Sequence, residues 1–163
     1  MALIKNGQSA DNVWRTLADK ESVPSDGPVI ISLKRWTEEK PWLKGRNAPL
    51  GIFLQADQPP AIIEDDLDRF EIVALEFPTF RDGRAYSYAR LLRERFGYKG
   101  EIRAVGDVLR DQLSFMQRCG IDSFEVADDA PIDQWVKAID EISVVYQPAT
   151  DARQTALEKR RSA

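Results

Sequence analysis

Hydrophobic and polar positions predict strands that alternate with helices from residue 29 onward. Five short runs rich in apolar and β-branched residues predict strands: Val29–Leu33, Leu50–Leu54, Glu71–Phe77, Glu101–Val105 and Ser123–Val126. Helical spacing follows each of them, with a proline interruption in the first case: Trp36–Arg46, Ile62–Phe70, Arg84–Phe96, Asp107–Cys119 and Ile132–Val145. This alternation is typical of an α/β fold, in which a mostly parallel sheet is connected by crossover helices.

Two architectures fit this order of elements. An open doubly wound sheet of about five strands is the first interpretation. A partial β/α barrel is the alternative, because it would accommodate the charged residues inside the strands. At the N-terminus, Ala2–Ile4 and Val13–Leu17 flank Asn6-Gly7, which predicts a short hairpin. The 163-residue length fits one domain. We place this domain at residues 1–146 and expect the polar segment 147–163 to be a flexible tail.

Charge and hydropathy limit the partners and the compartment. The net charge is −4 and the pI is about 5.0, so bulk attraction to nucleic acid or to anionic membranes is not expected. No run approaches the roughly 20 apolar residues that span a bilayer. The N-terminal residues contain no apolar stretch of signal-peptide length. We therefore expect a cytoplasmic protein.

The chain contains no histidine and a single cysteine, which limits the chemistry further. Ser-His-Asp and Cys-His catalytic arrangements, the usual zinc sites and imidazole ligation of haem are excluded. One cysteine cannot form an internal disulfide or hold an iron–sulfur cluster alone. We expect no metal and no cofactor held by a familiar motif. Cys119, at the end of a predicted helix and on its apolar side, is interpreted as a buried structural thiol.

The carboxyl ends of the predicted strands carry the candidate site, because ligands of parallel α/β proteins bind there. Gly83 would let backbone amides approach an anion, and the Arg84 guanidinium would bind an oxyanion; an ordinary turn at Asp82-Gly83 is the alternative. The candidate ligand-binding residues, with Asp128 as a neighbour on the same rim, are Glu76, Asp82, Gly83, Arg84, Arg103 and Asp107.

Two of these residues are charged and lie inside apolar strands. Glu76 and Arg103 are on consecutive strands, and a buried charge is costly unless it is paired. We expect them on one face of the sheet, either bonded to each other or facing a polar cleft. Gln112 is a second anomaly, because it falls in the middle of an apolar helical arc that includes Phe115.

The helix predicted over Arg84–Phe96 has a basic side. Arg90, Arg93 and Arg95 are interpreted either as a solvated helix face or as a docking surface for an acidic partner. The aromatic residues Trp36, Trp42, Phe77 and Phe80 are assigned to the core.

The stretch from Phe77 to Val126 resembles an uncharacterised bacterial family. The pieces that carry the resemblance are DGR, YSYARLLRERFGY, RAVGDVLRDQL and RCG, and the later VVYQPATD is also similar. Members of that family are described as oxidoreductases involved in sulfite reduction, and their genes tend to lie beside the gene for the assimilatory sulfite reductase hemoprotein. The resemblance implies a role in sulfate assimilation and cysteine biosynthesis, but it carries no assigned catalytic residues.

Three functional hypotheses follow. The first is a non-redox accessory protein that docks to the sulfite reductase hemoprotein or to its electron donor, as the resemblance implies. The second is a small protein or enzyme that binds an oxyanion or a nucleotide phosphate at the arginine-rich rim. The third is a flavin-binding electron carrier without a recognisable motif.

Overall fold

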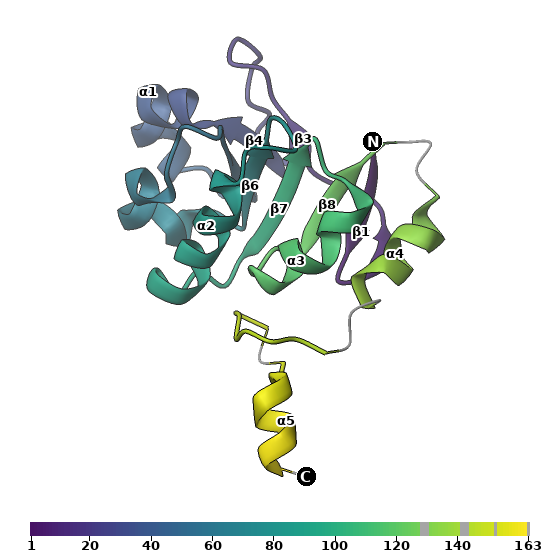
Figure 1. Ribbon diagram of the computed structural model, residues 1–163. Helices are drawn as coiled ribbons and strands as arrows, with labels where there is room; N and C mark the ends of the chain where they lie inside the picture. The colour runs from purple at the N-terminus through teal and green to yellow at the C-terminus, as the bar shows by residue number, and fades with distance from the viewer. Residues whose placement is uncertain (128–130, 141–143, 152, 163) are drawn as a thin grey trace.

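The computed structural model describes residues 1–127, 131–140, 144–151 and 153–162. In these residues one sheet of eight strands runs through the protein, in the spatial order β2-β1-β8-β7-β6-β5-β4-β3 (Figure 1). Its strands are β1 (Ala2–Lys5), β2 (Gln8–Ala10), β3 (Arg15–Thr16), β4 (Val29–Ser32), β5 (Leu50–Leu54), β6 (Ile72–Phe77), β7 (Glu101–Gly106) and β8 (Ser123–Val126).

The sheet is mostly parallel, as the sequence predicts. Strands β3 to β8 are parallel to one another, whereas β1 pairs antiparallel with both β8 and β2. The expected number of about five strands is too low, because β1, β2 and β3 add to the five predicted ones. The hairpin is confirmed, but its second strand is Gln8–Ala10 instead of Val13–Leu17. Asn6 and Gly7, with φ of 50° and 73°, form its two-residue turn.

Helices and shorter helical turns connect the strands. They are α1 (Leu33–Lys44), the 3₁₀ helix η1 (Pro60–Arg69), α2 (Arg84–Arg90), the π-helical turn η2 (Leu91–Arg95), the 3₁₀ turn η3 (Arg110–Gln112), α3 (Leu113–Arg118), α4 (Ile132–Asp140) and α5 (Ala156–Ser162). Because β4 to β8 are neighbours in chain order, successive right-handed crossovers place their helices on one face of the sheet (Figure 1).

Some helix boundaries differ from the prediction. Helix α1 starts earlier than Trp36 because the Ser32 hydroxyl accepts a hydrogen bond from the Arg35 amide, and it continues through Pro41. The helix predicted from Asp107 begins only at Arg110, as a 3₁₀ turn that leads into α3. The last predicted helix, Ile132–Val145, is α4 up to Asp140, and residues 141–143 lie outside the described residues.

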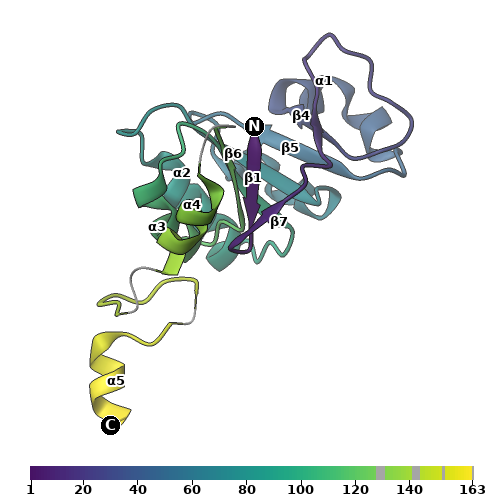
Figure 2. The same ribbon diagram turned by 90° about the vertical axis from the view of Figure 1, so that its right-hand side faces the viewer.

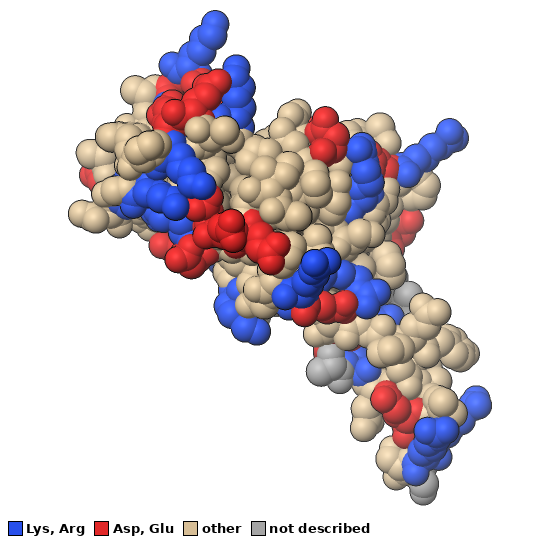
Figure 3. All heavy atoms as spheres, turned by 90° about the vertical axis from the view of Figure 1, so that its left-hand side faces the viewer, with Lys and Arg blue, Asp and Glu red and all other residues tan. Residues whose placement is uncertain are grey.

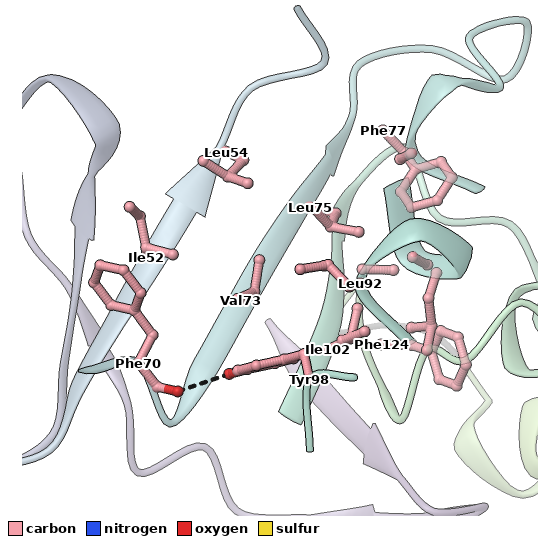
Figure 4. Packing of buried hydrophobic residues seen from close by; sticks show 14 of the residues in the cluster. Ile52, Leu54, Phe70, Val73, Leu75, Phe77, Leu92, Tyr98, Ile102 and Phe124 are labelled. Carbon is pink, nitrogen blue, oxygen red and sulfur yellow. Dashed lines mark hydrogen bonds between the residues drawn. The ribbon is translucent and has the colours of Figure 1, made fainter. Parts of the chain in front are cut away.

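The main core lies between the helices and the face of the sheet that they cover. The side chains that face this core occupy alternate positions along the strands and are almost fully buried (Figure 4). They include Ile52, Val73, Leu75, Ile102 and Phe124. The same figure shows the buried Tyr98, whose hydroxyl donates to the carbonyl of Phe70 at 2.9 Å. This packing fixes the strands whose carboxyl ends carry the candidate site.

The sheet is curled into a half-barrel, which supports the second of the two predicted architectures. A flat sheet would separate β2 from β3 by seven strand spacings, or about 34 Å. The chain between them consists only of residues 11–14 and can span at most about 18 Å. The two edges of the sheet must therefore approach each other, and this linking segment, the N-terminal strap (residues 11–14), crosses the concave face (Figure 2).

The strap covers part of the concave face with one aromatic ring. Trp14 packs against a small buried cluster of Ile30, Ile72 and Ala74, which point away from the main core. Gly51 lies on the same face, where an added Cβ would meet Ile72 Cγ2 at 2.2 Å. The concave face is therefore packed below the strap and leaves no space for an additional methyl group there.

The C-terminal segment is attached to α3 and then leaves the body of the protein. Arg118 is its anchor: the Arg118 carbonyl accepts from the Thr150 amide at 3.1 Å, and the guanidinium contacts Asp151 at 3.0 Å. Beyond a bridge between Val145 and Thr155, helix α5 projects away from the sheet (Figures 1 and 2). None of the described helices combines the length and the apolar character that crossing a membrane requires.

Candidate functional site

The predicted rim forms at the carboxyl end of β6, but its charges are engaged with each other. The Asp82 carboxylate accepts from the Arg84 backbone amide at 3.2 Å and from the Arg84 guanidinium at 3.0 and 2.6 Å. These hydrogen bonds from Arg84 hold the pKa of Asp82 below its ordinary value. The arginine predicted to bind an oxyanion therefore has an internal carboxylate as its partner.

Gly83 precedes α2 with an ordinary backbone conformation. Its φ is −92°, which any residue adopts, and the nearest atom to an added Cβ is 3.7 Å away on Tyr86. The special role predicted for a glycine at this position, close approach of a ligand to the backbone, is not required by the geometry. The turn interpretation of Asp82-Gly83 accounts for what is seen.

Asp107 lies at the same edge and organises a loop. Its carboxylate accepts from the Phe80 amide at 2.8 Å, which ties the loop after β6 to the end of β7. The predicted capping of a helix at Asp107 is wrong, since the following turn begins at Arg110. Gly106 allows the close contact of these two strand ends: it has a φ of +96°, and an added Cβ would meet the Phe77 carbonyl oxygen at 2.5 Å.

Arg103 is buried on the concave face, and its partner is not the one expected. Only 1% of Arg103 is exposed, and its guanidinium contacts Glu101 at 2.8 Å and Glu125 at 3.2 Å. It also donates to Asn12 in the strap at 2.8 Å and to the Ser123 hydroxyl at 3.3 Å. These bonds satisfy a charge that would otherwise be very costly to bury.

The expected ion pair between Glu76 and Arg103 is not formed. In the register of β6 and β7, Arg103 lies beside Ala74, and Glu76 lies beside Val105, one step further along the same face. Glu76 is half-buried, and its carboxylate accepts from the Ala56 amide at 3.2 Å. The expectation that both residues share one face is therefore confirmed, but each is satisfied separately.

The Arg103 cluster is balanced in charge. Lys5 on β1 contacts Glu101 at 2.6 Å, so two cations face the two carboxylates of Glu101 and Glu125. Burial alone would raise the pKa of Glu101, but hydrogen bonds from Lys5, Ser123 and Arg103 outweigh it and lower the pKa. This arrangement is a structural tie between β1, β7, β8 and the strap.

The three arginines of the predicted docking surface do not share one role. Arg93 is largely buried and donates to three backbone carbonyls, at Tyr98, Gly100 and Gly120, and to the Asp122 carboxylate. Burial raises the pKa of Asp122 despite these bonds. Arg93 therefore holds the start of β7 and β8 together and cannot offer its guanidinium to a partner.

The other two arginines remain on the surface. Arg90 is about half exposed and pairs with Glu94 at 2.8 Å. The Arg95 guanidinium lies 6.0 Å from the centre of the Phe96 ring. These two side chains keep the position that the docking prediction requires.

The buried structural role predicted for Cys119 is confirmed, whereas Gln112 remains an anomaly in the structure. Cys119 is buried as expected, and burial raises the pKa of its thiol. Gln112 ends the 3₁₀ turn η3, and its side-chain oxygen is buried without a hydrogen-bond partner within the described residues. Among the described residues, no three His, Cys, Asp or Glu side chains are grouped so that they could hold a metal ion. Asp128 lies outside the described residues.

Exposed aromatic rings are the surface feature that the sequence reasoning missed. Phe115 was predicted on the apolar side of its helix, yet 56% of it is exposed, and its ring lies 5.0 Å from that of Tyr86. Phe80, on the loop between β6 and α2, is also 56% exposed instead of belonging to the core. We call Phe80, Tyr86 and Phe115 the aromatic patch.

All three members of the aromatic patch lie near the carboxyl edge of the sheet. Phe80 and Tyr86 follow the end of β6, and Phe115 follows the end of β7. The Tyr86 ring also packs edge-on against the buried Phe77 at 5.1 Å, so the patch is supported from below. The core assignment is confirmed for Trp36 and Phe77 and is wrong for Trp42, which is 55% exposed.

Residues 51–157 match the model of a bacterial protein family of unknown function, DUF934. The match covers more than half of the chain, so the protein belongs to this family. It includes β5 except for its first residue, β6 to β8 of the half-barrel, the whole aromatic patch and the Arg118 anchor. No curated protein matches the sequence significantly.

Proposed function

We propose that this protein is a non-redox accessory protein of assimilatory sulfite reduction, which acts by docking to the sulfite reductase hemoprotein or to the electron donor of that enzyme. The link to sulfite reduction rests on the sequence resemblance. The chain itself has no histidine, and its one cysteine is buried, so neither histidine nor cysteine is available on its surface to ligate a haem or an iron–sulfur cluster.

The aromatic patch is the observation that carries the docking proposal. Exposed Phe115 and the supported Tyr86 ring form an apolar centre, and exposed Phe80 lies on the loop between β6 and α2 at the same edge of the sheet. Arg81, Arg84 and Arg90 belong to the same loop and helix and are exposed. An aromatic centre with arginines around it is the composition that distinguishes protein interfaces from ordinary surface. The partner surface that it fits is apolar with an acidic rim.

Co-purification tests this proposal directly. Tagged protein should retain the untagged hemoprotein, or its electron donor, at micromolar concentration. Phe115→Asp should weaken that binding at least about tenfold, since a buried aromatic anchor contributes well over 1.4 kcal/mol. Trp42→Asp is the matched control, because Trp42 is equally exposed but lies on α1. Absence of any association of the wild type at micromolar concentration with either protein would refute the proposal.

The oxyanion-binding alternative is tested in the same preparation. Calorimetry with sulfite and with sulfate measures it, and Arg84→Ala should abolish any binding at the predicted rim. The internal pairs of Arg84 with Asp82 and of Arg103 with Glu101 do not favour this alternative. An absorption spectrum of the purified protein tests the third hypothesis, because a bound flavin would give the protein a visible colour.

A further inference from the structure

Helix α5 buries none of its side chains against the described part of the protein. No residue of α5 is buried, whereas α1, η1, α2 and α3 each bury side chains. Leu157, in its first turn, is 56% exposed. A seven-residue helix is marginal in water without tertiary contacts, so a face of this kind is expected to be covered by something else.

Local bonds nevertheless hold α5 in shape. The Thr155 hydroxyl accepts from the Glu158 amide at 3.3 Å, and the Glu158 carboxylate accepts from the Thr155 amide at 2.7 Å. This reciprocal arrangement is a capping box, which satisfies the free amides at a helix start. Thr155 is itself buried at the base of the helix. The capping box therefore favours the helical conformation before any partner binds, which lowers the entropic cost of binding.

The charge of this segment is opposite to that of the rest of the protein. Residues 153–163 contain four cationic residues and one anionic residue, a net charge of +3. The whole chain has a net charge of −4, so residues 1–152 carry −7. We call α5 with its exposed Leu157, Arg160 and Arg161 the basic arm. Neither Arg160 nor Arg161 has an ion-pair partner within the described part of the chain.

A surface complementary to the basic arm, with an exposed aliphatic residue beside acidic side chains, lies on η1. Ile62 is 56% exposed, and the exposed carboxylates of Glu64, Asp65 and Asp68 stand on the same short helix. Within the described residues these three carboxylates have no ion-pair partner, in contrast to the buried Asp66 between them, which pairs with two lysines. We call Ile62, Glu64, Asp65 and Asp68 the acidic face.

The two surfaces complement each other in both respects. Each has one exposed branched aliphatic side chain beside unpaired charges, and the charges are of opposite sign. Figure 3 views the molecule from the side of α1 and η1 and shows a band of acidic side chains on the body, with basic side chains on either side of it, and a group of basic side chains near the tip of the arm. Because α5 projects away from the body, its side chains are accessible to another molecule.

We propose that the basic arm of one molecule docks on the acidic face of a second copy of this chain, so that two chains exchange arms in a symmetric dimer. Reciprocal docking uses the same pair of surfaces twice, as a twofold dimer requires. The second contact then forms within an existing complex, which raises the affinity beyond that of one short helix. This inference is independent of the proposed role in sulfite reduction.

Sedimentation at low and at high salt, with a charge-swap series, tests the exchange. The wild type should be a dimer at low salt and should dissociate as salt screens the charges. Reversal of the arm (Lys159→Glu, Arg160→Glu, Arg161→Glu) should weaken the dimer at least about tenfold. Reversal of the acidic face (Glu64→Lys, Asp65→Lys, Asp68→Lys) should do the same, and the combination of both reversals should restore the dimer.

A matched control separates specific docking from the effect of net charge. Lys20→Glu, Lys34→Glu and Lys137→Glu change the net charge by the same amount at exposed positions elsewhere and should leave the dimer intact. A wild type that stays monomeric at about 100 µM in low salt would overturn the proposal. A dimer that survives reversal of the arm, or a combined variant that stays as monomeric as the single ones, would overturn it equally.

Discussion

The Arg103 guanidinium on β7 donates a hydrogen bond of 2.8 Å to the side chain of Asn12, which precedes it by 91 residues. This contact attaches the N-terminal strap to the concave face of the sheet, and the same guanidinium neutralises Glu101 and Glu125. One guanidinium therefore ties the strap to two partly buried carboxylates on the sheet.

We predict that Arg103→Leu is among the most damaging single substitutions in this protein. It leaves two carboxylates on the concave face with only Lys5 as a counter-charge, which should lower the free energy of unfolding by about 3–5 kcal/mol. Urea denaturation measures this loss. The control is Arg90→Ala, which removes an exposed ion pair on a helix and should cost less than about 0.5 kcal/mol. Similar losses in both variants would contradict the structural role of Arg103.

Close packing on the concave face predicts that replacing Gly51 by alanine lowers stability much more than replacing Gly83 does. An Ala Cβ at Gly51 would lie 2.2 Å from Ile72 Cγ2 and 2.9 Å from Ile30 Cγ1, so Gly51→Ala should cost about 1–3 kcal/mol of stability through overpacking. Gly83→Ala introduces no close contact at an ordinary φ and should be neutral or slightly stabilising. Thermal unfolding of the two variants measures this difference in stability. An unchanged stability of Gly51→Ala would contradict the close packing of the concave face.

Arg93 and Arg95 should separate into a structural and a surface residue. Arg93→Ala leaves three carbonyls and the Asp122 carboxylate without their donor, and we expect a loss of about 2–4 kcal/mol. Arg95→Ala removes only a ring contact and should cost less than about 1 kcal/mol. Denaturant unfolding distinguishes the two. If docking to the hemoprotein is observed, a weaker interaction of Arg95→Ala at unchanged stability would assign Arg95 to the interface.

The carboxyl group of Asp66 makes stability depend on pH in a defined window. Burial alone would raise its pKa, but hydrogen bonds from Lys40, Lys44 and Trp36 outweigh it and lower the pKa. A lowered pKa in the folded state means that the stabilisation is complete above the unfolded value of about 3.9 and is lost as the pH falls through the folded value.

Asp66→Asn should therefore lower the free energy of unfolding at pH 7 by about 1–3 kcal/mol and should approach the wild type as the pH falls below about 4. Unfolding in urea across this pH range measures the difference. Asp68→Asn, at an exposed position of the same helix, should show no such convergence. A gap between Asp66→Asn and the wild type that stays constant with pH would refute the assignment.

The positions of the longer parallel strands could be predicted from the sequence. Runs such as Val29–Ser32 and Ile72–Phe77 are buried on both faces for most of their length, so they read as continuous apolar segments. Proline and glycine mark several of their ends. The two-residue strand β3 could not be found in this way, because Arg15–Thr16 is polar and is held by pairing with β4.

The ion-pair partners of the charged residues could not be predicted from the sequence. Arg103 selects Glu101 and Glu125, which are two positions away on its own strand and on the neighbouring strand, and these choices depend on the register and on the curl. Arg93 follows the pattern of a helix surface, and only the fold of the chain beneath it turns it inward. The exposure of Phe115 likewise depends on the late start of its helix at Leu113, which rotates the ring to the outside.

The pairing of β1 with β8 also determines when the sheet can be completed during synthesis. Residues 2–5 leave the ribosome long before their partner on one side, β8, and Ala2 pairs with Val126. The half-barrel can be completed only when residue 126 has emerged, 121 residues after the end of β1. Until then, β1 has only its short hairpin partner, and its other edge is open to other chains. A nascent chain of this protein is therefore most vulnerable to aggregation shortly before its last strand appears.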